Sequence, residues 1–290
     1  MSTQMQPAVP VVETISAIRS WSRAARARGV SVGLVPTMGA LHEGHLSLIR
    51  RAAAECAEVI VSVFVNPMQF NDARDLAAYP RSLDADVPTA ASAGATAIFA
   101  PSEGEMYSFG APLTRVEVSR LTDGLCGAAR PGHFAGMATV VTKLLAACEP
   151  DRAYFGEKDY QQLVVVTRMV DDLNLAVRIV PCPTVREPDG LAMSSRNARL
   201  SPAEREQAPL ISRALRSAEA AFRAGERDAA ELVRLAREVL AGATLGAMDY
   251  VELVDARDLT PVTRVGRDAL LAVAVRFPSA RLIDNVVLRV

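Results

Sequence analysis

Apolar strands and helices alternate along the chain up to residue 180, and this alternation constrains the fold more than any other feature of the sequence. Residues 59–65 form a run rich in β-branched residues that ends at Asn66-Pro67, as a buried strand does. Residues 13–28 instead space Ile15, Ile18 and Trp21 three apart and stop at Gly29, as an amphipathic helix does. Similar patterns predict strands at 30–36, 59–65, 95–100, 114–119, 152–155 and 176–180, and helices at 13–28, 45–57, 83–93, 135–147 and 159–172. The prediction is an α/β fold with a Rossmann-like, doubly wound, mostly parallel sheet.

The sequence changes character after Pro181. A loop rich in proline and charge precedes two Ala- and Arg-rich stretches, predicted as helices at 202–224 and 228–241. Strand-like runs follow at 248–254, 269–276 and 282–289. Helices followed by strands predict a smaller α+β domain. We therefore expect a larger domain over 1–185 and a smaller C-terminal domain over 186–290.

One strand, loop and helix unit carries the main functional signal: VGLVPTMGALHEGHLSLIR at 32–50. Its strand stops at Pro36, and Gly39 and Gly44 lie in the loop before the helix. In an open parallel sheet, ligands settle at the carboxyl ends of strands, and the first turn of the next helix offers unpaired N–H groups to an anion. His42 and His45 would project from one side of that turn and donate hydrogen bonds to a phosphate. The unit predicts a phosphate site.

Other interpretations of this unit stay open on these residues alone. A His-x-Gly-His pattern is short enough to arise by chance at a helix start. The dinucleotide fingerprint Gly-x-Gly-x-x-Gly and the P-loop pattern are both absent. A zinc site is disfavoured, because no Cys, Asp or third His lies at a useful spacing beside the pair.

A family resemblance is carried by PTMGALHEGH at 36–45, which resembles the signature of the pantothenate synthetase (pantoate–beta-alanine ligase) family of His-x-Gly-His nucleotidyltransferases. It covers most of 30–200, with weaker support to the end of the chain. Further segments that resemble the family are VFVNPMQF at 63–70, the stretch 75–86, GLCGAARPGHFAGM at 124–137, FGEKDYQQL at 155–163, GLAMSSRN at 190–197, DYVEL at 249–253 and RLIDN at 281–285.

The resemblance implies a ligase that converts ATP, pantoate and beta-alanine to pantothenate, AMP and pyrophosphate. A carboxylate is a poor electrophile, so pantoate would first attack the α-phosphate of ATP to give a pantoyl adenylate. Beta-alanine would then attack the acyl carbon. Domain 1–185 would bind nucleotide and pantoate, and domain 186–290 would be a lid that excludes water from the adenylate.

The resemblance also implies roles for particular residues. His42 and His45 would contact the α- and β-phosphates, with His42 the proton donor. Lys158 would bridge phosphate oxygens. The loop at 193–196 resembles the Lys-Met-Ser-Lys-Ser-type loop of class I synthetases and would close on pyrophosphate through Ser194, Ser195 and Arg196. The nucleotide would be bound by Met38, Gly39, Ala40, Leu41, His42, Glu43, Gly44, His45, Gly156, Glu157, Lys158, Asp159, Val185, Met193, Ser194, Ser195 and Arg196.

Two glutamines are implied in substrate binding, and magnesium is implied as the partner of ATP. Gln69 and Gln161 would hold pantoate, and Gln69 would also lie near beta-alanine. The family usually carries an acidic pair near magnesium, but here Asp86 follows Ala85. Magnesium usually keeps several waters and phosphate oxygens as ligands, so one carboxylate could suffice, and we expect no metal site made by the protein alone. The alternative is that the acidic residues of the 75–86 stretch simply lie at the start of a helix, where negative charge is favourable.

Composition limits the possible partners. The chain has 32 basic and 33 acidic residues, which argues against a bulk electrostatic grip on nucleic acid. The basic run Arg19, Arg23, Arg26 and Arg28 is expected to be the solvated face of a helix. No apolar run, including 8–12, is long enough for a secretory signal or a membrane span, and the four separated cysteines suggest thiols in the cytoplasm. The resemblance implies a homodimer.

Two alternatives differ from the ligase in what they do with ATP. An adenylyltransferase of the same superfamily would leave AMP on its product, but the two glutamine segments weigh against it. A non-catalytic nucleotide sensor on the same fold is also conceivable, since fold alone does not fix activity. The presence of His42, His45, Lys158 and Arg196 weighs against that interpretation.

Overall fold

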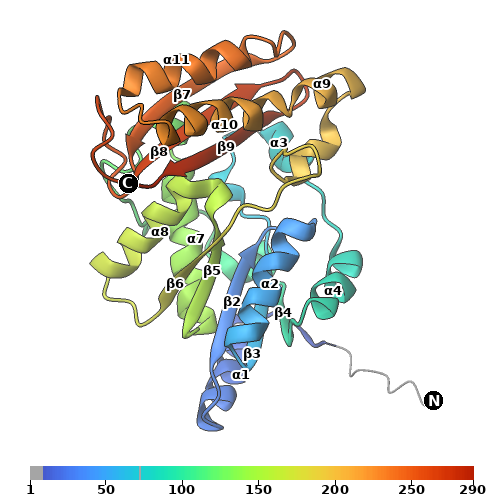
Figure 1. Ribbon diagram of the computed structural model, residues 1–290. Coiled ribbons are helices and arrows are strands. Elements are labelled where there is room, and N and C mark those ends of the chain that lie inside the picture. Colours follow the sequence, from blue (N-terminus) through green and yellow to red (C-terminus); the bar gives the residue numbers. More distant parts are fainter. Residues whose placement is uncertain (1–8, 72) are drawn as a thin grey trace, which may run out of the picture. The chain divides into compact units, whose positions relative to one another are not determined.

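A six-stranded sheet forms the centre of the first half of the molecule in the computed structural model, which describes residues 9–71 and 73–290 (Figure 1). Its strands lie in the order β1-β4-β3-β2-β5-β6. Each of the pairs β1–β4, β4–β3, β3–β2 and β2–β5 is parallel. The bounds are β1 (Val11–Val12), β2 (Val32–Thr37), β3 (Glu58–Val63), β4 (Ala97–Phe99), β5 (Arg152–Gly156) and β6 (Arg178–Cys182). The predicted α/β, doubly wound, mostly parallel fold is confirmed.

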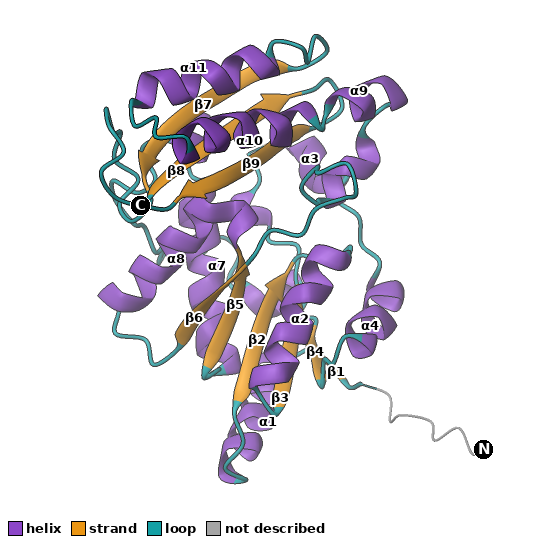
Figure 2. Cartoon of the chain, viewed as in Figure 1, coloured by secondary structure: helices purple, strands orange, loops and turns teal. Residues whose placement is uncertain are grey.

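Helices pack on the faces of this sheet (Figure 2). α2 (Glu43–Glu55) and α4 (Leu83–Ser92) pack against each other on one face, and α1 (Ile15–Ala27) packs against α7 (His133–Cys148) on the other. Val35, Ile49, Val61 and Ile98 are fully buried in the core between α2, α4 and the sheet. The remaining helices here are α3 (Ala73–Ala77), α5 (Glu103–Met106) and α8 (Tyr160–Asp172), with a 3-10 turn, η1 (Pro67–Gln69).

The strand order reverses between β2 and β5, which are neighbours in the sheet although β3 and β4 lie between them in the sequence. β2 continues to β3 and β4 on one side, and β5 continues to β6 on the other. Open α/β sheets bind their ligands outside the carboxyl ends of the strands at such a reversal. The loop at 38–42 starts from the end of β2, and the residues after Gly156 start from the end of β5.

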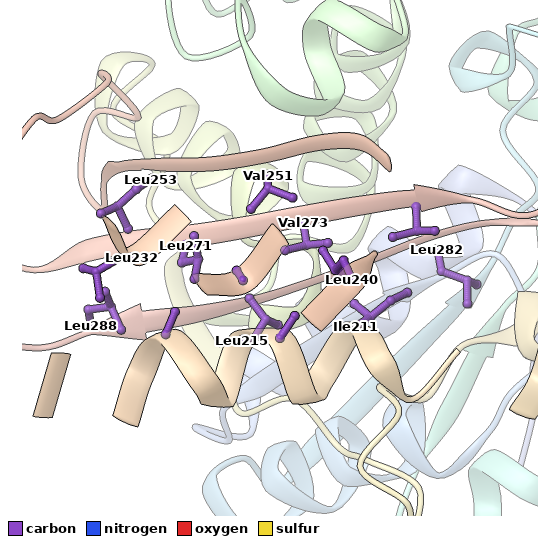
Figure 3. Packing of buried hydrophobic residues seen from close by; sticks show 14 of the residues in the cluster. Ile211, Leu215, Leu232, Leu240, Val251, Leu253, Leu271, Val273, Leu282 and Leu288 are labelled. Atoms are coloured by element: carbon purple, nitrogen blue, oxygen red, sulfur yellow. The ribbon is translucent and has the colours of Figure 1, made fainter. Parts of the chain in front are cut away.

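A three-stranded antiparallel sheet forms the second part. β7 (Ala247–Asp255), β8 (Ala269–Arg276) and β9 (Arg281–Leu288) lie in that order, and α10 (Leu210–Arg223) and α11 (Ala229–Leu240) pack on one face. Figure 3 shows Ile211 and Leu215 of α10 meeting the apolar side chains of the strands. The opposite face carries Leu270 and Ala272, which pack with Leu125 of the short helix α6 (Leu125–Ala129).

Residue contacts divide the chain into two compact units, and each unit consists of three separate segments of the sequence. The first unit comprises residues up to Glu117, Gly132–Phe155 and Val166–Cys182. The second comprises Val118–Pro131, Gly156–Val165 and Pro183–Val290. Two short segments therefore join the C-terminal residues, and the segment 156–165 includes Lys158 and Gln161. We refer to these as the first and second units.

The prediction of a strand at 114–119 is wrong. Val116 and the residues beside it do alternate in burial, but the N–H of Val116 donates to the Thr139 hydroxyl at 2.9 Å, and the neighbouring Arg115 and Glu117 are exposed. An alternating pattern indicates extended chain with one covered side. A burial pattern does not show whether a second strand lies alongside, and within the described chain residues 114–119 are not part of a strand.

Other differences are smaller. The single helix predicted at 202–224 is two helices, α9 (Pro202–Gln207) and α10, because Pro209 begins the second and has no N–H to continue the first. The two-residue strand β1 was not predicted, since so short a strand carries no pattern. Residue 8, the first of the apolar run at 8–12, lies outside the described residues. No described helix combines the length and apolarity that crossing a lipid bilayer requires.

Most of the predicted basic run is exposed, although Arg19 is half-buried, and its arginines form ion pairs with acidic side chains. The Arg23 guanidinium lies 2.9 Å from the Glu149 carboxylate, with Arg19 at 3.6 Å and Arg26 at 3.7 Å. Arg28 pairs with Glu58 at 2.6 Å. Exposed pairs of this kind contribute little stability each, about 0 to 1 kcal/mol. Their main consequence is that this face is not a bare basic patch.

Candidate active site

The two histidines of the 36–45 segment cap helix α2. His42 is the N-cap residue, and its Nδ1 accepts a hydrogen bond from the Gly44 N–H at 3.1 Å. The His45 Nδ1 accepts from the His42 N–H at 3.3 Å, which completes a reciprocal capping box. An imidazole nitrogen that accepts cannot carry the proton, so these bonds assign the proton of each neutral ring to Nε2. Both histidines are therefore fixed as Nε2–H donors, with ring centroids 4.1 Å apart.

Asp86 holds the loop that leads to this cap. Its Oδ1 accepts from the Leu41 N–H at 2.8 Å, and its Oδ2 accepts from the Ala40 N–H at 3.0 Å. Ala40 has a φ of 51° and Gly39 a φ of 82°, conformations in the left-handed region that a non-glycine residue seldom adopts. A Cβ on Gly39 would come within 2.9 Å of Asp86 Oδ2. Asp86 thus anchors a strained turn directly before His42.

Five backbone amides between residues 39 and 44 have hydrogen-bond partners, contrary to the expectation that they would be unpaired. The Gly39 N–H donates to the Thr37 hydroxyl at 3.2 Å, and the next amides donate to Asp86 and to the histidine rings. The imidazole rings of His42 and His45 accept two of these hydrogen bonds through Nδ1. The sequence predicted phosphate contacts from both backbone amides and the two imidazoles, and the structure shows that several of these amides already have partners.

Gln69 lies beside Met38 in the first unit. Its Nε2 is 3.0 Å from Met38 Sδ, and its Oε1 accepts from Asn66 Nδ2 at 3.0 Å. Asn66 is 1% exposed and also accepts from the Tyr107 hydroxyl at 2.7 Å. Burial raises the pKa of Tyr107 to about 12, so the phenol stays a donor at neutral pH. A buried polar network therefore fixes the base from which Gln69 projects.

Gly136 of α7 allows this network to form. A Cβ at this position would lie 2.2 Å from the Met68 carbonyl oxygen, closer than any real contact. The Gly136 carbonyl accepts from Asn66 Nδ2 at 3.2 Å. The 124–137 segment therefore contributes to the Gln69 side of the site through the absence of a side chain.

Lys158 and Gln161 belong to the second unit. Lys158 lies in a 3-10 turn, η2 (Glu157–Asp159), with its Nζ 3.8 Å from the Asp159 carboxylate, and its side chain is 18% exposed. Gln161 is 7% exposed. Its amide accepts from the Cys126 N–H at 3.0 Å and donates to the carbonyls of Leu121 and Gly124 at 2.9 and 3.0 Å. In this structure Gln161 fastens the 121–126 segment to α8.

A short hairpin presents the 193–196 loop. The Met193 N–H donates to the Val185 carbonyl at 2.9 Å, so these two predicted nucleotide contacts are backbone partners. Ser194 then caps the 3-10 turn η3 (Ser195–Arg199) by accepting from the Arg196 N–H at 3.3 Å. The three predicted pyrophosphate residues thus lie at the start of one turn.

The predicted site residues fall into two groups. The first unit brings together Met38, the loop 39–45 and Gln69. The second unit contains 156–159, Gln161, Val185 and 193–196. Sequence reasoning missed Asp86 as the loop anchor, because its partners are 45 and 46 residues away. Among residues 9–71 and 73–290, no three His, Cys, Asp or Glu side chains are grouped as a metal site would require.

Comparison with known proteins agrees with this geometry. The family model described as pantoate-beta-alanine ligase matches residues 10–287. The pantothenate synthetase of Heliobacterium modesticaldum is 52% identical over 280 residues, covering 97% of this chain and 99% of that protein. That of Myxococcus xanthus is 53% identical over 283 residues, covering 97% and 96%.

Solved structures give the same result. The crystal structure of pantothenate synthetase from Thermus thermophilus aligns with a TM-score of 0.90 at 46% identity, covering 96% of this chain and 98% of that chain. A pantoate-beta-alanine ligase from Francisella tularensis, complexed with beta-gamma ATP and beta-alanine, aligns with a TM-score of 0.79 at 35% identity, covering 96% and 97%. The resemblance inferred from the motifs is confirmed: the chain belongs to the pantoate-beta-alanine ligase family.

Proposed function

We propose that the two groups of residues described above carry out pantothenate formation through a pantoyl adenylate. As a member of its family, the chain is an ATP-dependent ligase that joins pantoate to beta-alanine. The observation that supports the adenylate route best is the double cap at His42 and His45. It orients two Nε2–H donors side by side at the start of α2, which follows the loop at the carboxyl end of β2.

The first step needs charge stabilisation rather than a covalent nucleophile from the protein. The pantoate carboxylate attacks the α-phosphorus of ATP, and negative charge moves onto the departing pyrophosphate. Donors that are already oriented stabilise such charge without reorganisation. We assign His42 and His45 to the α- and β-phosphates, with His42 as the proton donor, and the other members of the 38–45 segment to the nucleotide walls.

Lys158 and the 194–196 loop complete the phosphate contacts in this proposal. Lys158 supplies a cation from the turn after β5, with Gly156, Glu157 and Asp159 beside the nucleotide. Ser194, Ser195 and Arg196 combine two hydroxyl donors with a guanidinium, which suits a leaving pyrophosphate. Val185 and Met193, already hydrogen-bonded to each other, would line the nucleotide.

We assign pantoate to Gln69 and Gln161, and beta-alanine to the neighbourhood of Gln69. A neutral amide can bind both a hydroxyl and a carboxylate. Gln69 projects from a network held by Asn66. Gln161 has three hydrogen bonds to the 121–126 backbone, so binding pantoate would require it to exchange one of them.

Magnesium enters this scheme as the partner of ATP, held by phosphate oxygens and water. Magnesium prefers such ligands to a cage made only of protein groups. Both oxygens of Asp86 accept from loop amides, so we do not assign Asp86 as its ligand. The ion would neutralise charge on the phosphates.

We further propose a homodimer. Phe109 lies in a turn and Leu113 in a bend just before the segment 114–119, and both side chains are fully exposed, at 101% and 103%. A second copy covering these side chains would bury them. A protein that sediments as a monomer at micromolar concentration would contradict this proposal.

We place the reaction in the cytoplasm and keep domain 186–290 as a lid. All four cysteines are buried free thiols, which suits a reducing compartment. A water-sensitive acyl adenylate favours a site that closes when substrates bind. Identical small-angle scattering profiles with and without ATP plus pantoate would contradict the lid.

The proposed route is tested by incubating the protein with ATP, magnesium and pantoate, with and without beta-alanine, and identifying products by mass spectrometry. The expected result is AMP and pantothenate only when beta-alanine is present. Pyrophosphate release with AMP retained on the product would instead indicate an adenylyltransferase.

A further inference from the structure

Asp284 and Asn285, adjacent residues of β9, are buried polar side chains to which the scheme above gives no role. They are 3% and 8% exposed. Because side chains alternate along a strand, Asp284 shares a face with Leu282 of the helix-covered core. Asn285 shares the opposite face with Val287, which packs against the cluster around Leu125. The two side chains therefore leave the sheet in opposite directions.

Asn285 is bonded to the turn that carries Lys158. Its Nδ2 donates to the Glu157 carbonyl at 3.0 Å and to the Lys158 carbonyl at 2.9 Å. Both carboxamide hydrogens are thus committed to two successive carbonyls of the 3-10 turn η2. A turn of three residues has few bonds of its own, so this side chain fixes the direction in which Lys158 leaves the backbone.

Asp284 is bonded to the hairpin that leads into the 194–196 loop. It accepts from Arg186 in a two-pronged ion pair, at 2.6 and 3.0 Å, and its Oδ1 also accepts from the Asn285 N–H at 2.8 Å. The same guanidinium donates to the Gly190 carbonyl at 3.0 Å, across the hairpin. Arg186 is bridged to Ala192 through the backbone, two residues before Ser194.

We infer that Asp284 and Asn285 are positioning residues for the ligase reaction, and that this dipeptide holds Lys158 and the 194–196 loop in one fixed geometry. The inference rests on the phosphate roles proposed above for those two segments. Neither residue touches substrate in this assignment: Asn285 acts through the Lys158 turn, and Asp284 acts through Arg186. A displacement of about 1 Å in a catalytic group can cost about 100-fold in rate, so a small change here would be measurable.

The first test is Asn285→Ala, with Val273→Ala as the matched control. Val273 lies opposite Asp284 on β8 and is fully buried in the same sheet, but it bonds to neither segment. We expect Asn285→Ala to lower the single-turnover rate of pyrophosphate release from ATP and pantoate by about 10- to 100-fold, leaving the KM for pantoate unchanged. Val273→Ala should lower Tm while keeping the rate. Equal rate losses in both variants, or no loss in Asn285→Ala, would overturn the inference.

If Asn285→Ala does not fold, Asn285→Ser provides a second test, because the serine hydroxyl keeps one hydrogen-bond donor. Its rate should lie between those of the native protein and Asn285→Ala. A serine variant with native Tm and native rate, together with an alanine variant that does not fold, would mean that Asn285 is only structural, and the inference would fail.

A double-mutant cycle shows whether Asn285 acts through Lys158. If it does, adding Asn285→Ala to Lys158→Ala should cost little further rate, because the group that it positions has gone. Additive losses would refute the inference while leaving the proposed role of Lys158 intact. A Lys158→Ala variant with native turnover would refute that proposed role itself, and the inference with it.

The ion pair is tested by replacing both charges, as Asp284→Asn with Arg186→Gln. Removing one partner would leave a buried charge unpaired, whereas the double replacement keeps an amide pair of similar size. The expected result is a stable protein with a pyrophosphate-release rate reduced about 10-fold. A native rate would show that Asp284 does not position the loop.

Discussion

The anchoring of the histidine loop by Asp86 makes a sharp prediction for Asp86→Asn. The amide keeps one acceptor oxygen but places an NH2 group against the second loop amide, so one of the two bonds to Ala40 and Leu41 is lost. A hydrogen bond to a charged group contributes about 1.5 to 3 kcal/mol. Since Asp86 is 3% exposed, water cannot replace the lost bond. We therefore expect unfolding to become about 1.5 to 3 kcal/mol easier.

The same substitution should slow catalysis, because the freed loop leads directly to His42. A catalytic group displaced by about 1 Å can lose about 100-fold in rate, so we expect the adenylate step to fall by roughly 10- to 100-fold. The KM for beta-alanine should change little, since that substrate enters after the histidines have acted. Urea unfolding and single-turnover pyrophosphate release measure the two effects separately.

Asp84→Asn is the matched control. Asp84 lies in the same first turn of α4 but is exposed, so its substitution removes the same charge near the helix N-terminus without touching the loop. We expect native turnover and a stability change below about 0.5 kcal/mol. If both variants lose activity equally, helix charge rather than loop anchoring is responsible. If Asp86→Asn keeps native turnover and stability, the anchoring argument is wrong.

Three further substitutions test other parts of the account. Lys158→Ala should cut turnover by about 10²- to 10³-fold, or about 2.7 to 4 kcal/mol of transition-state stabilisation, while the circular dichroism spectrum stays native; near-normal adenylate formation would contradict its role. Gly136→Ala should lower both Tm and pantoate binding, because a Cβ would lie 2.2 Å from the Met68 carbonyl; a calorimetric titration with unchanged affinity would refute the close approach. Hydrogen bonds from the backbone of Ser201 and from Ser279 lower the pKa of Glu204 from 4.5 to about 2. A lowered carboxyl pKa stabilises the fold above the unfolded pKa, and this is lost as pH falls through the folded value. The stability difference between the native protein and Glu204→Gln should thus be largest near pH 7 and shrink from about pH 4.5 to about pH 2; a difference independent of pH would contradict this.

Sequence patterns predicted the parts of the fold that depend on local order. The runs at 59–65 and 269–276 correspond to the buried strands β3 and β8 because their composition leaves no polar face. The helix predicted from 45 begins two residues earlier, at Glu43, after the His42 cap. The segment 114–119 shows the limit. Its alternation is genuine, but whether extended chain becomes a strand depends on a neighbour that no local pattern specifies.

In the candidate site, too, features set by contiguous residues could be predicted, and features set by contacts between distant residues could not. The strand, loop and helix at 32–50 could be predicted because the glycines, histidines and strand end are contiguous, and the phosphate role of the loop stays a prediction. The anchors could not, because Asp86 reaches Ala40 across 46 residues and Asn285 reaches Lys158 across 127. Such contacts arise only when the chain has folded. The buried amide of Gln161, with three bonds to backbone, likewise gives no sign in the sequence of where its partners lie.

The most direct test of the central claim follows one oxygen atom. The protein is incubated with ATP, magnesium, beta-alanine and pantoate labelled with ¹⁸O in its carboxylate, and the AMP is analysed by mass spectrometry. Attack of the carboxylate on the α-phosphorus, followed by attack of the amine on the acyl carbon, predicts one ¹⁸O in each AMP. Unlabelled AMP alongside labelled pantothenate would contradict a pantoyl adenylate and the roles assigned to His42 and His45.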